Sequence, residues 1–310
     1  MRLDLLAALA GALIAVQSRV NGELSHRLNN GLEAALVSFG SGLIVLIVIS
    51  LFIPGIKAGA INLRGAIRNG AMPSWRLLAG ALGATFVIVQ TQMVPVLGVA
   101  IFSVASIAGQ TAASLGVDRM GLTGGGKKQI TSRRVFAALL TILAVLVSVI
   151  DRIDAKNLSV YGLILAGIAG MIVGFQRAFN GRINELTRQS FTTSLINFIT
   201  GTSFLLLVCA IGIFTHRTHF SALPNGPWWI YTGGSIGVLY IAFSATIVQH
   251  LGVLTFTLFT VGGQLVGSLL IDIFMPTQGV HISWYLVTGI VMTYLGVVVG
   301  GTNHLRLVRK

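Results

Sequence analysis

Apolar runs of membrane-spanning length recur along the whole chain, separated by short stretches rich in Pro, Gly and charged residues. A helix needs roughly 20 predominantly apolar residues to cross the hydrocarbon core of a bilayer. Hydropathy and this punctuation therefore predict ten transmembrane helices. Their expected limits are residues 3–22, 33–53, 75–93, 97–117, 134–150, 160–178, 191–214, 228–248, 252–274 and 283–302.

The tryptophans of the chain support these limits. Trp75, Trp228, Trp229 and Trp284 all lie at the expected starts of spans. Indole prefers the membrane interface, because its ring is apolar while its N–H needs a polar partner. Hydropathy alone gives the limits, so the positions of the tryptophans are independent evidence for them.

One polar phrase occurs twice in this apolar background. Residues 14–24 read IAVQSRVNGEL and residues 173–183 read VGFQRAFNGRI, which aligns Gln17 with Gln176 and Asn21 with Asn180. Further matches continue through both halves at a slightly different spacing. They pair Trp75 with Trp229, Gly80 with Gly234, Gly83 with Gly237, Gly109 with Gly263, Gln110 with Gln264 and Asp118 with Asp272.

These matches predict two copies of a five-helix unit, in residues 1–152 and 153–310. Because five is an odd number, the second copy enters the membrane from the opposite side. Many secondary transporters contain inverted repeats of this kind, related by a pseudo-two-fold axis in the membrane plane. The expected fold class is an all-α membrane protein with ten transmembrane helices in a 5+5 inverted arrangement.

Composition agrees with the hydropathy pattern. Only 9% of the residues are charged, 54% are hydrophobic and the mean hydropathy is +0.87. A soluble domain has about a quarter of its residues charged, so the chain falls outside that class. The net charge of +13 would suit a nucleic-acid partner only if the basic residues were gathered on a soluble face. They lie between apolar runs instead, so no nucleic-acid partner is expected.

The basic residues also predict the orientation in the membrane. With the N-terminus inside, sixteen of the 21 Lys and Arg residues fall on the inner side and five on the outer side. Basic residues are concentrated in cytoplasmic loops. Both termini are therefore expected in the cytoplasm, and the chain is expected to be a multi-pass protein of the inner (plasma) membrane.

Polar side chains inside the spans are the candidates for a substrate pathway. Buried polar groups in a membrane helix need a partner or a water-filled cavity. The candidates are the carboxamides of Gln17, Asn21, Gln176, Asn180, Gln110 and Gln264. Either these groups line a pathway shared by the two halves, or they hydrogen-bond neighbouring helices as structural contacts. Duplication fits both interpretations.

Four charged residues near these positions are further candidates. Arg19 and Arg177 flank the repeated phrase without aligning with each other, and either can bind an anionic substrate group or reach the lipid headgroups. Asp118 and Asp272 form a matched pair at span ends, one near each membrane face. They are candidates for alternating gates that pair with arginines, and the alternative is that they are solvated helix caps.

Other chemistry has little support in the sequence. No Asp or Glu falls in the middle of a predicted span, which weakens a proton-antiport mechanism, and His250 is the best remaining titratable candidate. Neither HExxH nor GxSxG occurs. The lone Cys209 cannot form an internal disulfide. We therefore expect no enzyme activity, no catalytic residues, no cofactor and no metal site.

The phrase AVQSRVNGEL…AALVSFGSGLIVL, and its recurrence as GFQRAFNGRINEL…TSLINFITGTSFLLL, resemble the drug/metabolite transporter superfamily. The resemblance is to a branch of bacterial inner-membrane exporters in which single five-helix units and two-copy fusions both occur. It covers essentially the full chain. It implies an inner-membrane exporter with a central cavity, and the repeated-phrase residues Gln17, Asn21, Gln176 and Asn180 match its motif.

Together these features predict a secondary transporter that exports a small polar or amphipathic metabolite or drug-like molecule by alternating access. The expected aromatic walls of the cavity are Phe86, Phe102, Phe175, Tyr240 and Phe256. The expected partners are the small-molecule substrate and the lipid bilayer, with a second copy of the chain as a further candidate. The alternative function is a non-transporting membrane scaffold or partner subunit.

Overall fold

The computed structural model describes residues 3–122, 130–150, 159–216, 219–251, 253–276 and 282–301. Every regular element in these ranges is helical, which confirms the all-α class. The α-helices are α1 (Leu3–Leu28), α2 (Gly31–Phe52), α3 (Gly55–Arg68), α4 (Ala79–Leu97), α5 (Val99–Met120), α6 (Ser132–Ser148), α7 (Val160–Thr187), α8 (Ser190–Phe214), α9 (Gly233–Leu251), α10 (Val253–Phe274) and α11 (Trp284–Gly301). The 3-10 helices η1 (Ser74–Leu78) and η3 (Trp228–Tyr231) lead into α4 and α9.

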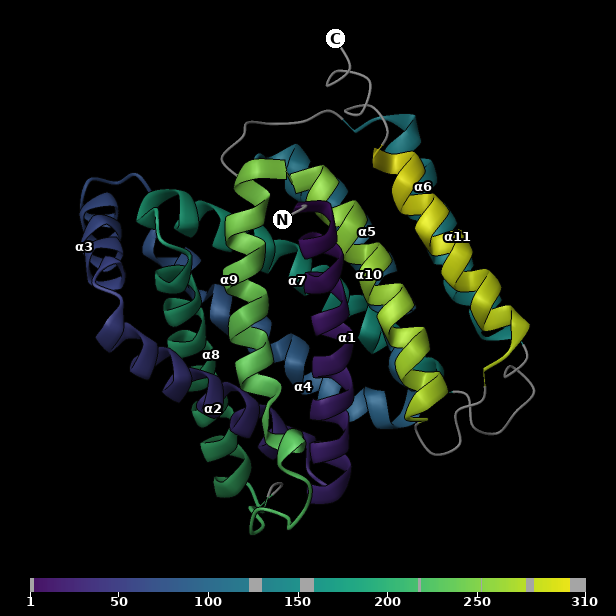
Figure 1. Cartoon of the computed structure of the whole chain (residues 1–310), viewed down its shortest axis with the longest axis horizontal. Helices are drawn as coiled ribbons and strands as arrows, with labels where there is room; N and C mark the ends of the chain where they lie inside the picture. The colour runs from purple at the N-terminus through teal and green to yellow at the C-terminus, as the bar shows by residue number, and fades with distance from the viewer. Residues whose placement is uncertain are drawn as a thin grey trace.

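The helices form one bundle (Figure 1). In this view α1 runs from the upper part of the bundle to its lower end, and α3 lies at the upper left. We call the end of the bundle that holds α3 and the start of α1 the α3 end, and the opposite end the far end. The chain therefore reaches the far end in the α1–α2 turn and returns to the α3 end at the close of α2.

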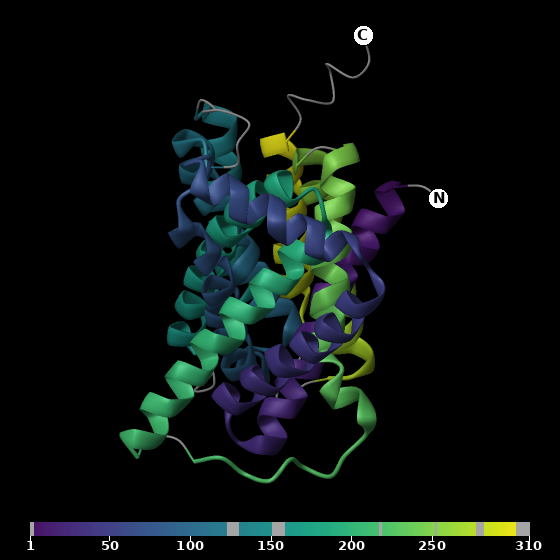
Figure 2. The same cartoon turned by 90° about the vertical axis from the view of Figure 1, so that its left-hand side faces the viewer.

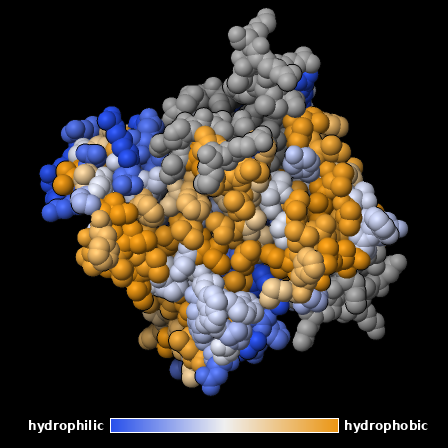
Figure 3. Space-filling view, in the orientation of Figure 1, coloured by the Kyte–Doolittle hydropathy of each residue, from blue (hydrophilic) through white to orange (hydrophobic). Residues whose placement is uncertain are grey.

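The apolar helices coincide with the ten predicted spans. Six of them are long and apolar enough to cross a membrane, namely Leu3–Leu28, Gly31–Phe52, Ser74–Leu97, Val99–Val117, Val160–Thr187 and Ser190–Phe214. Shorter apolar helical segments are Val135–Ser148, Gly233–Ser244, Phe259–Phe274 and Trp284–Gly296. Apolar residues dominate the middle of the face seen in Figure 3. A soluble monomer rarely exposes so continuous an apolar surface, and a bilayer accounts for it.

α1 and α7 extend beyond the spans predicted for them. α1 continues to Leu28 rather than residue 22, and α7 continues to Thr187 rather than residue 178. Ion pairs along the helix support both extensions: Glu23 pairs with Arg27 four residues later, and Arg182 pairs with Glu185 three residues later. Such pairs stabilise a helix while lowering its hydropathy, so a hydropathy window ends too early there.

Close packing at glycines joins helices from the two halves of the chain. Gly11 of α1 lies against the backbone carbonyl of Thr260 in α10, and Gly170 of α7 lies against the carbonyl of Ser106 in α5. A β-carbon at either glycine would overlap that carbonyl. Small residues at such crossings allow the backbones to approach, which is how helices associate in lipid. These glycine contacts therefore set the close approach of α1 to α10 and of α5 to α7.

Two further helix pairs also join the two halves of the chain. α6 packs against α11 at the right-hand side of Figure 1. α2 crosses α8, where the rings of Phe39 and Phe198 lie 5.1 Å apart. Gly42 of α2 lies under the ring of Phe198, and Gly201 of α8 lies under the ring of Phe39. The interior of the bundle is filled by α5, whose residues 99–110 are all buried.

α3 is a helix that the hydropathy pattern did not predict. Its apolar residues are spaced to cover one side of the helix: Ile56, Gly59 and Leu63 are buried while most of its other residues are exposed. A hydropathy window averages these two faces and finds no span. Figure 2 shows α3 lying across the other helices on the side that faces the viewer.

Candidate functional site

The polar residues in the second half of α1 are joined to α4 by buried hydrogen bonds. Nδ2 of Asn21 donates to Oε1 of Gln90 (3.0 Å), and Nε2 of Gln90 donates to Oγ of Ser18 (2.7 Å). All three side chains are at most 1% exposed. Ser18 and Asn21 are three residues apart and so share a helix face. Because unpaired amides are costly in apolar surroundings, this chain of hydrogen bonds holds α1 against α4.

The same part of α1 also meets the start of α9. Nε2 of Gln17 donates to the carbonyl of Gly233 (2.9 Å). Oδ1 of Asn21 lies beside the α-carbon of Gly233, and it has no hydrogen-bond partner among the described residues. The amides of the first copy therefore hydrogen-bond to two helices, α4 and α9, in the half of α1 nearer the far end of the bundle.

The second copy of the phrase makes different contacts. Nε2 of Gln176 donates to Oδ1 of Asn197 (3.1 Å), and Nδ2 of Asn197 donates to Oδ1 of Asn180 (2.6 Å). Asn197 lies on α8, and Gln176 also lies against Gly83 of α4. The amides of the second copy therefore hydrogen-bond to the neighbouring helix α8, whereas those of the first copy hydrogen-bond to α4 and α9.

Gln90 and Asn197, which organise these two networks, were not among the predicted site residues. The search for duplicated polar groups passed over them because neither is repeated. The position equivalent to Gln90 in the second half holds Ser244, and the position equivalent to Asn197 in the first half holds Ser38. The available signal was that both are amides inside predicted spans.

Gln110 and Gln264 lie apart from both networks. They are buried in α5 and α10, with exposed fractions of 9% and 1%. In the described part of the chain, neither side chain is hydrogen-bonded to the amides of α1 or α7, and Oε1 of Gln110 has no partner. The structure therefore distributes the predicted carboxamides among separate places in the bundle.

Arg19 forms an ion pair with an acid of its own helix. Its Nη1 lies 3.0 Å from Oε2 of Glu23, whose other oxygen binds Nε of Arg27 at 2.8 Å. Nε of Arg19 also donates to the carbonyl of Met275, just after α10 (3.2 Å). This cluster fastens the end of α1 to the end of α10 at the far end of the bundle.

Arg177 has a different environment. Its Nη2 donates to Oη of Tyr240 on α9 (3.0 Å), while its buried Nε has no partner among the described residues. No ion pair in the described part of the chain includes Arg177; Glu23 and Glu185 are both paired with other arginines. The side chain reaches from α7 towards α9 and carries a charge that no described acid balances.

Asp272 caps a helix in this structure. Its carboxylate is 2% exposed and accepts hydrogen bonds from the backbone N–H groups of Val99 (3.2 Å) and Ala100 (2.7 Å) at the start of α5. A carboxylate is favourable at a helix N-terminus. Of the two interpretations given to it, the cap is the one that matches its contacts, although the cap is buried rather than solvated. The side chains of Asp118 and His250 lie outside the described residues.

Two equivalent glycines reveal a difference between the halves. Gly22 of α1 is buried against Val94 and Pro95 of α4. Gly181, its counterpart in α7, is exposed, and no described atom of another element lies within 4 Å of the place a β-carbon would take. Arg177 and Gly181 are four residues apart, so both face α9. α1 is thus closed on α4, while α7 stands away from α9.

The predicted aromatic walls lie in different environments. Phe86 and Phe102 are buried with ring centroids 5.7 Å apart, and both belong to the apolar core. Phe175 is partly buried, and Tyr240 contacts Arg177. The side chain of Phe256 lies outside the described residues. Among the members of this set whose side chains are described, Tyr240 lies beside the gap between α7 and α9.

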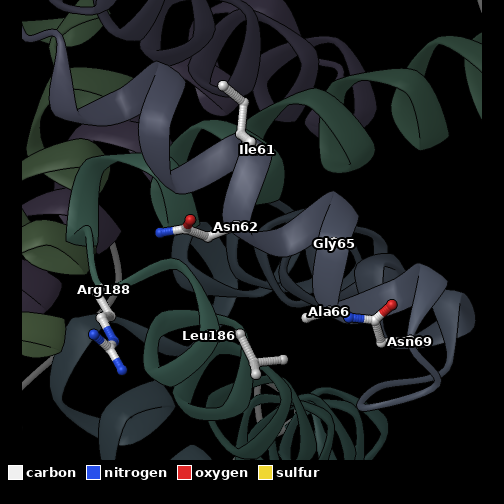
Figure 4. A pocket seen from close by; sticks show the side chains of 7 residues that line it. All are labelled: Ile61, Asn62, Gly65, Ala66, Asn69, Leu186 and Arg188. Carbon is white, nitrogen blue, oxygen red and sulfur yellow. The ribbon is translucent and has the colours of Figure 1, made fainter.

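A cleft of about 550 Å³ opens between α3 and the end of α7 (Figure 4). It is lined by Ile61, Asn62, Gly65, Ala66, Asn69, Leu186 and Arg188. None of the predicted pathway residues lines it. The cleft is a surface feature of the α3 end, separate from the amide networks.

Known proteins resemble this chain in sequence and in fold. The model of a family described as "Putative inner membrane exporter, YdcZ" matches residues 3–147 and 161–299. No curated protein matches the chain. One solved structure, described only as "Crystal structure of protein", aligns with 99% of this chain and 98% of its own at a TM-score of 0.61 and 13% sequence identity. At that identity the likeness concerns the fold alone.

Proposed function

Since the chain belongs to the YdcZ family of inner membrane exporters, we propose that it exports a small polar or amphipathic molecule as a secondary transporter. The family is one of transporters rather than enzymes, and its members are placed in the inner membrane. Alternating access, in which a central site opens to one side at a time, is the mechanism that we propose for it.

The two halves, residues 1–152 and 153–310, are inverted repeats in this proposal. Two observations support it. The family model matches the chain in two segments of similar length. Equivalent helix pairs also pack through equivalent residues: Gly263 of α10 lies against the carbonyl of Ala8 in α1, and Gly109 of α5 lies against the carbonyl of Gly167 in α7.

We place the α3 end of the bundle in the cytoplasm. Lys57, Arg64, Arg68 and Arg188 are all exposed at this end. Basic residues are concentrated on the cytoplasmic side of membrane proteins. The far end, where Glu23 pairs with Arg19 and Arg27, then faces the outside.

The contrast between Gly22 and Gly181 is the observation that carries the proposal. At the far end, α1 is sealed on α4 by Gly22 and by the Ser18–Gln90–Asn21 hydrogen bonds. At the α3 end, the equivalent position in α7 faces open space. A molecule with two equivalent gates, one closed and one open, is in one of the two states that alternating access requires. The described conformation is open toward the cytoplasm in this assignment.

Arg177 is the residue that we assign to the substrate. A charged side chain inside a membrane bundle is costly, and such residues mark substrate or ion pathways. Arg177 lies beside the α7–α9 gap, with one donor on Tyr240 and its buried Nε unpaired. A guanidinium presents its remaining donors most favourably to a carboxylate or phosphate. We therefore propose a substrate that carries an anionic group.

Gly181→Leu tests the alternating gates. The open space around Gly181 accepts the larger side chain in the described state, but closure of α7 on α9 would then overpack the contact. Overpacking costs about 1–3 kcal/mol, and about 1.4 kcal/mol changes a population tenfold. Export is expected to fall about tenfold or more. The measurement compares metabolites released by cells that contain the wild type, the variant or no transporter.

Gly40→Leu is the matched control. Gly40 of α2 also has open space at its β-carbon position, but it does not belong to either gate. This variant should be present in the membrane at the wild-type level and should export normally. Equal export by Gly181→Leu and the wild type would refute the gate. Release of no compound by cells that contain wild-type protein in the membrane would refute the transport function.

A further inference from the structure

α3 is fixed to the bundle by its buried face. The hydroxyl of Thr192 in α8 donates to the carbonyl of Ile56 (3.0 Å), and Gly59 lies directly against Thr192. Leu63 packs into an apolar cluster with Phe179 and Ile183 of α7. These contacts place α3 on the end of α7 and the start of α8, at the α3 end of the bundle.

The outward face of α3 is basic with one apolar residue. Lys57, Ile61, Arg64 and Arg68 follow one another at intervals of three or four residues, so they form one stripe, and all four are exposed. In the described part of the chain, none of the three cations takes part in an ion pair. Hydrophilic residues gather over α3 at the upper left of Figure 3. A helix with this pattern is typical of one lying in the membrane interface.

The neighbouring stripe of α3 borders the cleft. Asn62 and Asn69 lie on the α3 side of the cleft, and Leu186 and Arg188 lie on the opposite side (Figure 4). Within the described residues, the side chains of Asn62, Asn69 and Arg188 form no hydrogen bond. Their N–H donors therefore surround a cleft whose other lining residues, such as Ile61 and Leu186, are apolar or small.

We propose that this cleft binds an anionic phospholipid of the cytoplasmic leaflet. Arg188 binds the phosphate, and the amides of Asn62 and Asn69 donate to other oxygens of the headgroup and glycerol region, since a guanidinium and N–H groups are the donors that phosphate and ester oxygens accept. An acyl chain lies along Ile61 and Leu186, and Lys57, Arg64 and Arg68 attract the anionic surface around it. The site requires the α3 end to face the cytoplasm but does not depend on what the protein transports.

The test is thermal unfolding of the full-length purified protein in neutral detergent with added phosphatidylglycerol or phosphatidylcholine. Phosphatidylglycerol should raise the unfolding temperature more than phosphatidylcholine does, and added salt should reduce the difference. Arg188→Gln should remove most of the difference. Replacing Lys57, Arg64 and Arg68 with Gln should lower the apparent affinity about fivefold for each charge removed.

Arg119→Gln is the matched control, because Arg119 lies at the end of α5 and outside the cleft. It should keep the full response to phosphatidylglycerol. If Arg188→Gln does not fold, the double variant Asn62→Ala/Asn69→Ala probes the same cleft, since both residues are exposed. Equal stabilisation by the two lipids, or an undiminished response in the cleft variants, would overturn the proposal. Stabilisation by glycerol phosphate alone would replace the lipid with a free phosphate.

Discussion

At the scale of single residues, the two arginines of the repeated phrase have opposite environments. Arg19 is paired with Glu23, which it shares with Arg27, and also binds the carbonyl of Met275. Arg177 donates to a neutral tyrosine and leaves a buried N–H unpaired. A balanced charge in a bundle stabilises a contact, whereas an unbalanced one attracts an anion. From the sequence, the same two interpretations apply to both arginines. Their contacts in the folded protein distinguish them.

Arg177→Gln should therefore reduce export of anionic compounds while leaving the fold intact. Glutamine retains a donor but loses the charge. A hydrogen bond to a charged group is worth about 1.5–3 kcal/mol, so a loss of roughly tenfold to a hundredfold is expected. The measurement is the release of each anionic metabolite by cells that contain equal amounts of each variant.

Arg182→Gln serves as the control for this charge change. Arg182 lies on the same helix but pairs with Glu185, whose side chain is 57% exposed. Exposed ion pairs contribute about 0–1 kcal/mol, so its export should stay close to that of the wild type. If the two variants lose export equally, the general loss of positive charge is responsible, and Arg177 has no specific role.

At the scale of helices, backbone-to-backbone contact decides which helices pair. The glycine pairs with GxxxG spacing in the sequence include Gly170 with Gly174 and Gly263 with Gly267. Gly170 lies against Ser106, Gly174 against Ala113, Gly263 against Ala8 and Gly267 against Ala12. All four lie at the α5–α7 or α1–α10 crossing. In lipid, van der Waals contact and hydrogen bonds rather than hydrophobic burial drive helix association, so the smallest residues select the partner.

Gly109→Ala and Gly263→Ala should each destabilise the protein. A β-carbon at these positions would overlap the carbonyls of Gly167 and Ala8. Overpacking of this kind costs about 1–3 kcal/mol. Gly40→Ala, which meets no atom within 4 Å, should be neutral or stabilising by up to about 1 kcal/mol through helix propensity. Thermal unfolding of the three variants in the same detergent measures the difference, and equal unfolding temperatures would contradict the proposed crossings.

At the scale of the whole molecule, the two halves have matching turns at equivalent positions of the sequence. Asn29 in the α1–α2 turn and Arg188 in the α7–α8 turn are equivalent positions. Both have the left-handed backbone conformation, with φ of 48° and 53°, and both are exposed. Inverted repeats place these two turns on opposite sides of the membrane.

Single cysteines at positions 29 and 188 test this sidedness. The native Cys209 is buried and can be replaced with Ala in both variants. A membrane-impermeant maleimide added to intact cells should label position 29, whereas position 188 should react only after the membrane is opened. Labelling of both positions from the same side would rule out the inverted repeat and, with it, alternating access by two equivalent gates.

The sequence by itself determined the all-helical class, the ten apolar segments and the family resemblance. Hydropathy is a local property of the chain, and a bilayer imposes a fixed length on each span, so these features can be predicted without contacts. The helices that were missed or predicted too short also follow from this use of local hydropathy. α3 was missed because its two faces average out, and α1 and α7 were predicted too short because paired charges continue both helices.

Only the tertiary structure decided which partner each polar group takes. The amides of Gln17 and Gln176 occupy matching positions in the two phrases, yet one binds Gly233 and the other binds Asn197. It also decided that α4 covers Gly22 while Gly181 is exposed, and that Arg188 lines a cleft with α3. Hydrogen bonds and crossings depend on residues far apart in the chain. Two phrases that share their polar residues can therefore have different roles once the helices have packed.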